Sequence, residues 1–186
     1  MILIVGLGNP GDEYKNTRHN VGFIAVDRLS DRYNFNWQHK SKFNADIAVG
    51  ECELGKIILC KPDTFMNLSG QAVQPIMSFY KIPLENMIVI HDDIDLPLAK
   101  IKYKLSGGAG GHNGLKSLDK IVGSNYHRIR IGIDRPADRR HDVADYVLGK
   151  FSNKENEEIA HKIEILADKL PLLASDQIEK FKTQIG

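Results

Sequence analysis

Residues 2–26 read ILIVGLGNPGDEYKNTRHNVGFIAV, and this stretch decides the fold. The apolar run at residues 1–5 predicts a buried strand, and a polar, glycine-rich loop follows it. From Val21 onward, apolar residues recur every four positions at Ala25, Leu29 and Tyr33, which predicts a helix with one apolar face. A strand, a loop and a helix in this order are typical of the start of an α/β domain.

The loop contains Gly-Leu-Gly-Asn-Pro-Gly at residues 6–11, a literal match to the G-x-G-x-x-G pattern of dinucleotide-binding folds. Those folds place the third glycine inside the first helical turn, whereas here Pro10 precedes Gly11 and the helix begins about eight residues later. The acidic residue expected about 20 residues on would be Asp27 or Asp31, which fall inside the helix. A turn is therefore favoured, with dinucleotide binding kept as an alternative.

The remaining chain continues to alternate strands with helices. Strands are expected at residues 45–52, 56–61, 87–91, 100–104 and 127–133, and helices at residues 67–82, 115–122, 144–151, 153–170 and 176–184. Because the 45–61 hairpin and the strands between 100 and 133 can pair antiparallel, we expect a mixed sheet with a largely parallel core. The prediction is a single α/β domain over residues 1–186, flanked by helices.

Charge is unevenly distributed along a chain whose formal net charge is +1. Residues 100–140 hold ten Lys and Arg against three Asp, a local net charge of +7. This segment indicates either an anionic partner or a solvated surface. The apolar runs fall far short of the ~20 residues of a membrane span, and no basic segment of a signal peptide precedes the first one. With two cysteines and no C-x-x-C, we expect a cytoplasmic protein without a membrane partner.

Four polar segments lie beside predicted strands. They are GNPGDEYKNTRHN (residues 8–20), TFMNLSG (64–70), HDDID (91–95) and GGAGGHNG (107–114). Since ligands of open α/β sheets bind beyond the carboxyl ends of strands, these loops are expected to converge. Each also has a simpler interpretation: Asn67 as a helix cap, Asp92 as part of a capped turn, and the glycines as a flexible loop.

The polar segments contain no clear nucleophile. Ser69 does not lie in a G-x-S-x-G turn, and neither cysteine has a catalytic context. Metal-ligand types occur without any standard metal-binding spacing, at His91, Asp92, Asp93, Asp95 and His112. Water activated by a histidine base is the remaining chemistry, with a carboxylate partner and asparagine amides as donors.

Five motifs at residues 5–22, 61–73, 91–118, 127–136 and 146–151 resemble bacterial peptidyl-tRNA hydrolases in order and spacing. The resemblance covers roughly residues 1–150 and is weak from 151 to 186. It implies a monomeric enzyme without a metal or other cofactor. Its substrate would be the 3′ end and acceptor stem of peptidyl-tRNA, and it would cleave the ester between peptide and tRNA. A non-catalytic RNA-binding or dinucleotide-binding domain remains the alternative.

The resemblance also implies roles for individual residues. His19 corresponds to the catalytic base, Asp92 to the group that stabilises it, and Asn113 to a residue that positions water. In this interpretation Gly6, Gly8 and Gly11 shape a turn that presents Asn9. Substrate binding is assigned to Asn9, Tyr14, Phe65, Met66 and Asn67, and tRNA phosphate binding to Lys104 and Arg130.

Overall fold

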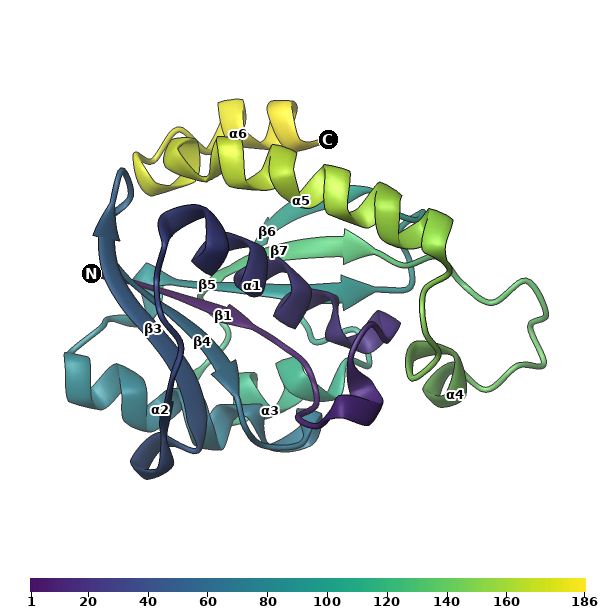
Figure 1. The fold of residues 1–186 in the computed structure, drawn as a ribbon, viewed down its shortest axis with the longest axis horizontal. Coiled ribbons are helices and arrows are strands. Elements are labelled where there is room, and N and C mark those ends of the chain that lie inside the picture. The colour runs from purple at the N-terminus through teal and green to yellow at the C-terminus, as the bar shows by residue number, and fades with distance from the viewer.

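The computed structural model describes residues 1–186 and contains one seven-stranded mixed sheet with helices on both faces (Figure 1). The strands are β1 (Ile2–Gly6), β2 (Gln38–Lys40), β3 (Ala45–Cys52), β4 (Gly55–Pro62), β5 (Met87–Asp93), β6 (Ile101–Leu105) and β7 (His127–Gly132). Their order is β2-β3-β4-β1-β5-β7-β6, and the central strands β4, β1, β5 and β7 are parallel. The outer pairs are antiparallel, so the predicted mixed sheet with a parallel core is confirmed.

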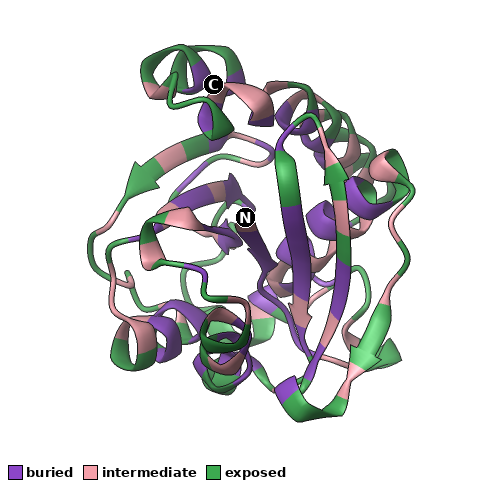
Figure 2. Cartoon of the chain, turned by 90° about the vertical axis from the view of Figure 1, so that its left-hand side faces the viewer, coloured by how far each residue is buried: buried purple, intermediate pink, exposed green.

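Helices cover the two faces of the sheet separately. One face carries α1 (Val21–Tyr33), α5 (Asn153–Ala174) and α6 (Ile178–Ile185), and the other carries α2 (Ser69–Tyr80) and α3 (Asn113–Val122) (Figure 1). Because successive side chains of a strand point to opposite faces, Ile4 of β1 joins the first core while Leu3 and Val5 join the second. Figure 2 shows the buried residues on the central strands and on the helix surfaces that face them.

Gly6, Gly8 and Gly22 allow close packing between α1 and the start of the sheet. A Cβ on Gly22 of α1 would lie 2.6 Å from the carbonyl oxygen of Leu7, and one on Gly6 would lie 2.7 Å from the Gly22 carbonyl carbon. Gly8 similarly faces the ring of Phe23, so among the three glycines only Gly11, with φ 109°, needs the left-handed region. The expectation that all three shape a turn was wrong for Gly6 and Gly8, which let α1 approach the sheet.

Most predicted elements are present, with differences at short or polar segments. The predicted helix over residues 144–151 is only α4 (Val143–Val147), and Pro75 lies inside α2 without ending it. The strand β2 was missed because its three residues, Gln38–Lys40, show no apolar alternation. Five 3₁₀ turns were also missed: η1 (Asp12–Tyr14), η2 (Arg18–Asn20), η3 (Ser41–Phe43), η4 (Met66–Leu68) and η5 (Leu84–Asn86). None of the helices has the length and apolar character needed to cross a bilayer.

Candidate active site

The four polar segments converge at the carboxyl edge of the parallel strands, as the sequence predicted. They surround a cavity of about 680 Å³. Its lining includes Asn9, His19, Phe65, Met66, Asn67, Asp92, His112 and Asn113, which represent all four segments. The lining brings together residues that lie far apart in the sequence, from segments at the carboxyl ends of β1, β4 and β5 and from the start of α3.

The first segment is folded back on itself, which places His19 beside Asn9. The amide N–H of Asn9 donates to Asn20 Oδ1 at 2.8 Å, and Asn20 Nδ2 donates to the Asn9 carbonyl at 2.9 Å. Asn20 is buried at the end of η2, immediately before α1 begins. His19 therefore directly precedes a buried asparagine that these bonds tie to the Asn9 backbone at the start of the first helix.

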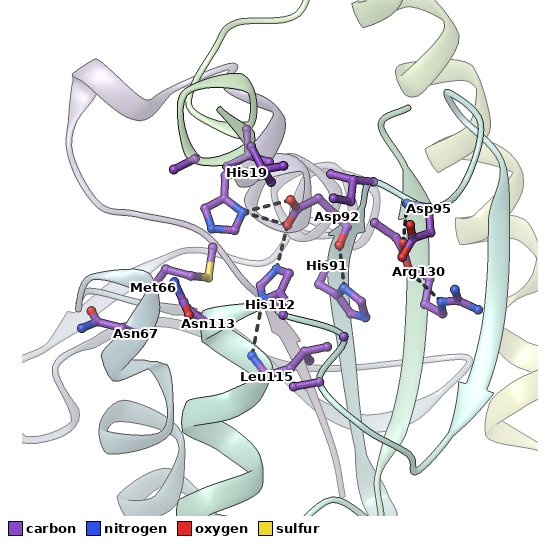
Figure 3. Close-up of a pocket in the computed structure, with 18 of the residues that line it drawn as sticks. His19, Met66, Asn67, His91, Asp92, Asp95, His112, Asn113, Leu115 and Arg130 are labelled. Atoms are coloured by element: carbon purple, nitrogen blue, oxygen red, sulfur yellow. Dashed lines mark hydrogen bonds and ion pairs between the residues drawn. The ribbon is translucent and has the colours of Figure 1, made fainter. Parts of the chain in front are cut away.

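Asp92 lies between two histidines. It ends a buried stretch of β5, is only 3% exposed, and has both carboxylate oxygens within 3.0 Å of His19 Nδ1 (Figure 3). His112 Nε2 lies 2.8 Å from Asp92 Oδ1 on the other side. The arrangement is a His19–Asp92–His112 triad with one carboxylate shared by two rings.

The surrounding hydrogen bonds determine which ring nitrogens carry protons. At the start of α3, the backbone N–H groups of Gly114 and Leu115 point at His112 Nδ1, at 3.1 and 3.4 Å. That nitrogen must accept, so we assign the proton of a neutral His112 to Nε2, which donates to Asp92. In the same way we assign a proton to His19 Nδ1, which donates to the carboxylate and leaves His19 Nε2 able to accept a hydrogen bond.

The triad is also the cluster most suited to a metal ion, because its three ligand atoms lie within 4.8 Å of one another. A metal bound to His112 Nε2 would require the proton on Nδ1 instead. That proton would face the two N–H donors of the α3 N-terminus. The donor set therefore fits a hydrogen-bonded triad better than a metal centre.

Burial and charge have opposite effects on the pKa values of His19 and Asp92. Burial lowers the pKa of His19, but the negative charge of Asp92 and its hydrogen bond outweigh burial and raise the pKa above the ordinary 6.5. Burial alone would raise the pKa of Asp92, yet its two histidine partners hold it far below the usual range. Burial lowers the pKa of the adjacent His91 to about 3, so that ring stays neutral. Asp92 is therefore ionised wherever His19 titrates.

Three asparagines supply amide groups around the cavity. Asn9 Oδ1 accepts from the Met66 N–H at 2.8 Å, which fixes the orientation of the amide and leaves Nδ2 available to a ligand. Asn67 and Asn113 are exposed, line the cavity and make no side-chain hydrogen bond within the protein. The Phe65 side chain, 57% exposed, adds an apolar surface beside them.

Tyr14 is the one predicted site residue that does not line the cavity. It follows Gly11 in η1, and its ring meets that of Phe65 edge-on with centroids 6.4 Å apart. Tyr14 therefore borders the cavity through Phe65 and does not reach the triad.

The basic segment at residues 100–140 is only partly exposed at the surface. Lys104 and Arg130 both line the cavity, and Arg130 Nε lies 2.8 Å from Asp93 Oδ2. Arg128 is 1% exposed and donates to the carbonyls of Gly107 and Gly108, at the start of the loop that carries His112. The prediction that this segment is either an anion-binding or a solvated surface was therefore wrong for Arg128, which supports the glycine-rich loop from inside.

Sequence reasoning missed the roles of His112 and Arg128. His112 stood out only as a possible metal ligand, because its contact with Asp92 depends on where α3 begins. The available signal was its place directly before Asn113 and Gly114, where a side-chain acceptor can cap a helix. Arg128 gave no signal, since alternation in HRIRIGI predicts only that Arg128 and Arg130 share a face.

Comparisons with known proteins agree on one family. The family model described as peptidyl-tRNA hydrolase matches residues 3–186. Peptidyl-tRNA hydrolases of Rickettsia canadensis (strain McKiel) and Rickettsia bellii (strain RML369-C) are 47% and 50% identical, with 100% of each chain covered. The crystal structure of peptidyl-tRNA hydrolase from Acinetobacter baumannii is similar with a TM-score of 0.93 at 40% identity, covering 100% of this chain and 94% of that one. The similarity thus includes residues 151–186, where the motifs alone were weak.

Proposed function

The chain belongs to the peptidyl-tRNA hydrolase family, and we propose that His19, Asp92 and Asn113 carry out hydrolysis of the ester between peptide and tRNA. The observation that supports this assignment is the pairing of His19 Nδ1 with a buried, ionised Asp92. A neutral imidazole held in this tautomer presents Nε2 as a proton acceptor at the cavity.

In the proposed reaction, His19 Nε2 takes a proton from water as the water oxygen attacks the ester carbonyl. Asp92 stabilises the imidazolium that forms, and the Asn113 amide orients the water. Amide donors stabilise the developing oxyanion, for which one donor can contribute roughly 3 kcal/mol. The carbon–oxygen bond to the ribose then breaks, and the leaving oxygen takes the proton from His19.

The asparagines account for a preference for peptidyl over free aminoacyl esters. Asn9 and Asn67 can donate to the carbonyl and accept from the N–H of the first peptide bond, while Phe65 and Met66 contact the adjoining chain. A free α-amino group is positively charged and lacks that carbonyl, so it would leave these amides without partners. Discrimination therefore depends on the amide whose orientation the Met66 N–H fixes.

The proposal also covers contacts with the tRNA, domain organisation and oligomeric state. Lys104 and Arg130 would contact phosphates near the acceptor stem, with Tyr14 on the tRNA side of the 3′ end. We propose that residues 1–186 act as one domain, since α5 and α6 pack on the same core as α1. The enzyme would act as a monomer without a metal, in the cytoplasm where translation supplies its substrate.

Release of tRNA from N-blocked aminoacyl-tRNA tests the proposal. The protein should release tRNA, and His19→Ala should lower kcat about 10²–10⁴-fold while the thermal unfolding midpoint stays near that of the parent. His161→Ala, an exposed histidine of α5, is the matched control. A His19→Ala variant that retains a near-normal rate would remove His19 as the base, and absence of turnover in the parent would favour the non-catalytic alternative. Inhibition by a chelator that a divalent metal reverses would restore the metal interpretation.

A further inference from the structure

The turn that carries His19 is joined to the segment between α4 and α5. The Arg18 N–H donates to the Gly149 carbonyl at 3.0 Å, and the Phe151 N–H donates to the Asn16 carbonyl at 3.1 Å. Between these two bonds, Thr17 and Lys150 form an isolated antiparallel bridge. In Figure 1 the purple segment ahead of α1 accordingly lies beside α4.

The Arg18 side chain adds contacts to the same region. Its guanidinium carbon lies 4.3 Å from the centre of the Tyr146 ring, and Nη1 donates to the Tyr146 carbonyl at 3.4 Å. Nη2 lies 3.5 Å from Glu155 Oε1, in an ion pair whose Arg18 side chain is only 15% exposed. We call Arg18, Tyr146 and Glu155 the Arg18 cluster.

Both partners of Arg18 are themselves fixed. Glu155 Oε1 also accepts from the Ser152 N–H at 2.8 Å in the capping box that begins α5. The Tyr146 hydroxyl donates to the Ile133 carbonyl at 2.7 Å. A Cβ on Gly149 would lie 2.7 Å from Arg18 Nη1, so a side chain at this position would displace the guanidinium.

Helix α4, whose Tyr146 contacts Arg18, also forms one wall of the cavity. Val143, Ala144, Val147 and Leu148 line it, whereas Arg18 does not. The Arg18 guanidinium contacts an aromatic face, a carbonyl and a carboxylate, and its one nitrogen without a partner, Nε, is buried, so the group is poorly suited to bind substrate directly. Its neighbour in sequence, His19, does reach the cavity.

We propose that Arg18 is a positioning residue, which acts through the Arg18 cluster to fix the His19 turn against the α4 wall. The inference rests on the proposed role of His19 as the base. A base displaced by about 1 Å can lose about 10²-fold in rate, so the cluster should affect kcat far more than substrate binding. Because α4 lines the cavity, the same contacts set the distance between the substrate wall and the base.

The test compares Arg18→Met and Tyr146→Leu with a matched control, using N-blocked aminoacyl-tRNA. Each variant should lower kcat about 10–100-fold, as expected for a misplaced catalytic group, with KM changed less than about twofold. Arg28→Met is the control, because Arg28 also joins the N-terminal part of the chain to α5, through Glu164 at 3.8 Å, but lies outside the cavity lining. Arg28→Met should retain the parent kcat. A raised KM with normal kcat in Arg18→Met would overturn the proposal and make Arg18 a substrate ligand.

Three further measurements test whether Arg18 acts by position, by charge or through separate contacts. If Arg18→Met misplaces His19, its kcat should stay below that of the parent at every pH. Full recovery of kcat at one end of the pH range would instead assign Arg18 an electrostatic role and overturn the proposal. The Arg18→Met/Tyr146→Leu double variant should lose no more kcat than the worse single variant, since both substitutions remove the Arg18–Tyr146 contact. Additive losses of kcat would contradict the shared cluster.

Arg18→Lys keeps the charge but not the planar stacking, so its kcat should lie between those of the parent and Arg18→Met. It also serves if Arg18→Met does not fold, and parent-like kcat in Arg18→Lys and Tyr146→Leu would then refute the inference.

Failure of this inference is distinguishable from failure of the proposed function. If His19→Ala is inactive but the cluster variants behave like Arg28→Met, only the positioning role is lost. If His19→Ala is active, the proposed base is wrong and the positioning role falls with it.

Discussion

At the scale of single residues, the shared carboxylate of Asp92 is the main feature of the site. Asp92 accepts hydrogen bonds from His19 and His112, so its charge serves two partners. Both ring nitrogens of His112 have protein partners, Asp92 on one side and the helix N–H groups on the other. No protein group pairs with His19 Nε2, so of the two rings His19 is the one with a nitrogen open to the cavity.

Asp92→Asn tests the carboxylate through the pH dependence of kcat/KM. The charge and hydrogen bond of Asp92 raise the pKa of His19, so their loss leaves burial to lower it. If His19 is the base, as proposed, only its neutral form is active, so the acid limb of the profile should move to lower pH. The plateau should fall at least about tenfold, because the imidazolium and the tautomer lose their support. Asp145→Asn, an exposed acid of α4, is the control; an acid limb that moves to higher pH would contradict the assignment.

His112→Ala tests the second partner of Asp92. Without this donor the carboxylate charge acts on His19 alone, so the pKa of His19 should rise and the acid limb of kcat/KM should move to higher pH. The variant also loses the α3 cap, which should lower the free energy of unfolding by about 1 kcal/mol. His112→Asn can cap the helix and should recover most of that stability, measured by urea unfolding. An unmoved acid limb in His112→Ala would show that the bond to Asp92 does not tune the base.

At the scale of elements, the contact between α1 and β1 sets the geometry of the site. Gly6 and Gly22 let the helix approach the strand closely, and the turn that carries His19 ends where this helix begins. Helix packing and the placement of the proposed base, His19, are therefore determined by the same pair of elements.

Gly22→Ala should disturb this contact. The added Cβ would lie 2.5 Å from the Leu7 backbone nitrogen, so the free energy of unfolding should fall by about 1–3 kcal/mol, as for other overpacked sites. Gly108→Ala is the matched control, because nothing lies within 4 Å of its Cβ and its φ is ordinary. Urea unfolding of both variants measures the difference, and equal stabilities would mean that α1 can shift without penalty.

The same elements show what the sequence could predict about the fold. The helix α1 followed from apolar periodicity, the 45–61 hairpin from two runs split by a turn, and β5 from a β-rich run that is buried almost throughout. The strand β2 did not, since an exposed edge strand of three residues needs no apolar pattern. Residue types and loop positions located the candidate site, but not the Arg18 cluster, in which Arg18 bonds to a residue 128 positions away. Long-range contacts between polar residues leave no periodic signal.

At the scale of the whole molecule, positive charge is placed on one edge of the sheet. In the β6–β7 ladder, Lys102 pairs with Arg130 and Lys104 with Arg128, so these four side chains share a face. With Arg128 buried, the accessible cations beside the cavity are Lys104 and Arg130. RNA recognition through phosphates and shape suits an enzyme whose substrates differ in sequence.

Lys104→Gln should weaken binding of complete tRNA substrates without affecting the chemical step. KM for N-blocked aminoacyl-tRNA should rise several-fold, and the salt dependence of log KM should decrease by about 0.7–0.9 for the lost phosphate contact. A minimal ester without the tRNA stem should be hydrolysed normally. Lys56→Gln is the control, because Lys56 is exposed near the amino end of β4, opposite the cavity. Equal effects on the two substrates would exclude a phosphate contact.

The reciprocal hydrogen bonds between Asn9 and Asn20 have an evolutionary consequence. They join the Asn20 side chain to the backbone of Asn9, so a change of the Asn9 side chain leaves both bonds in place, whereas a change of Asn20 removes both. A lineage can therefore alter selectivity through Asn9 while keeping this link, but a change at Asn20 would loosen the Asn9 loop and the residue next to His19 together.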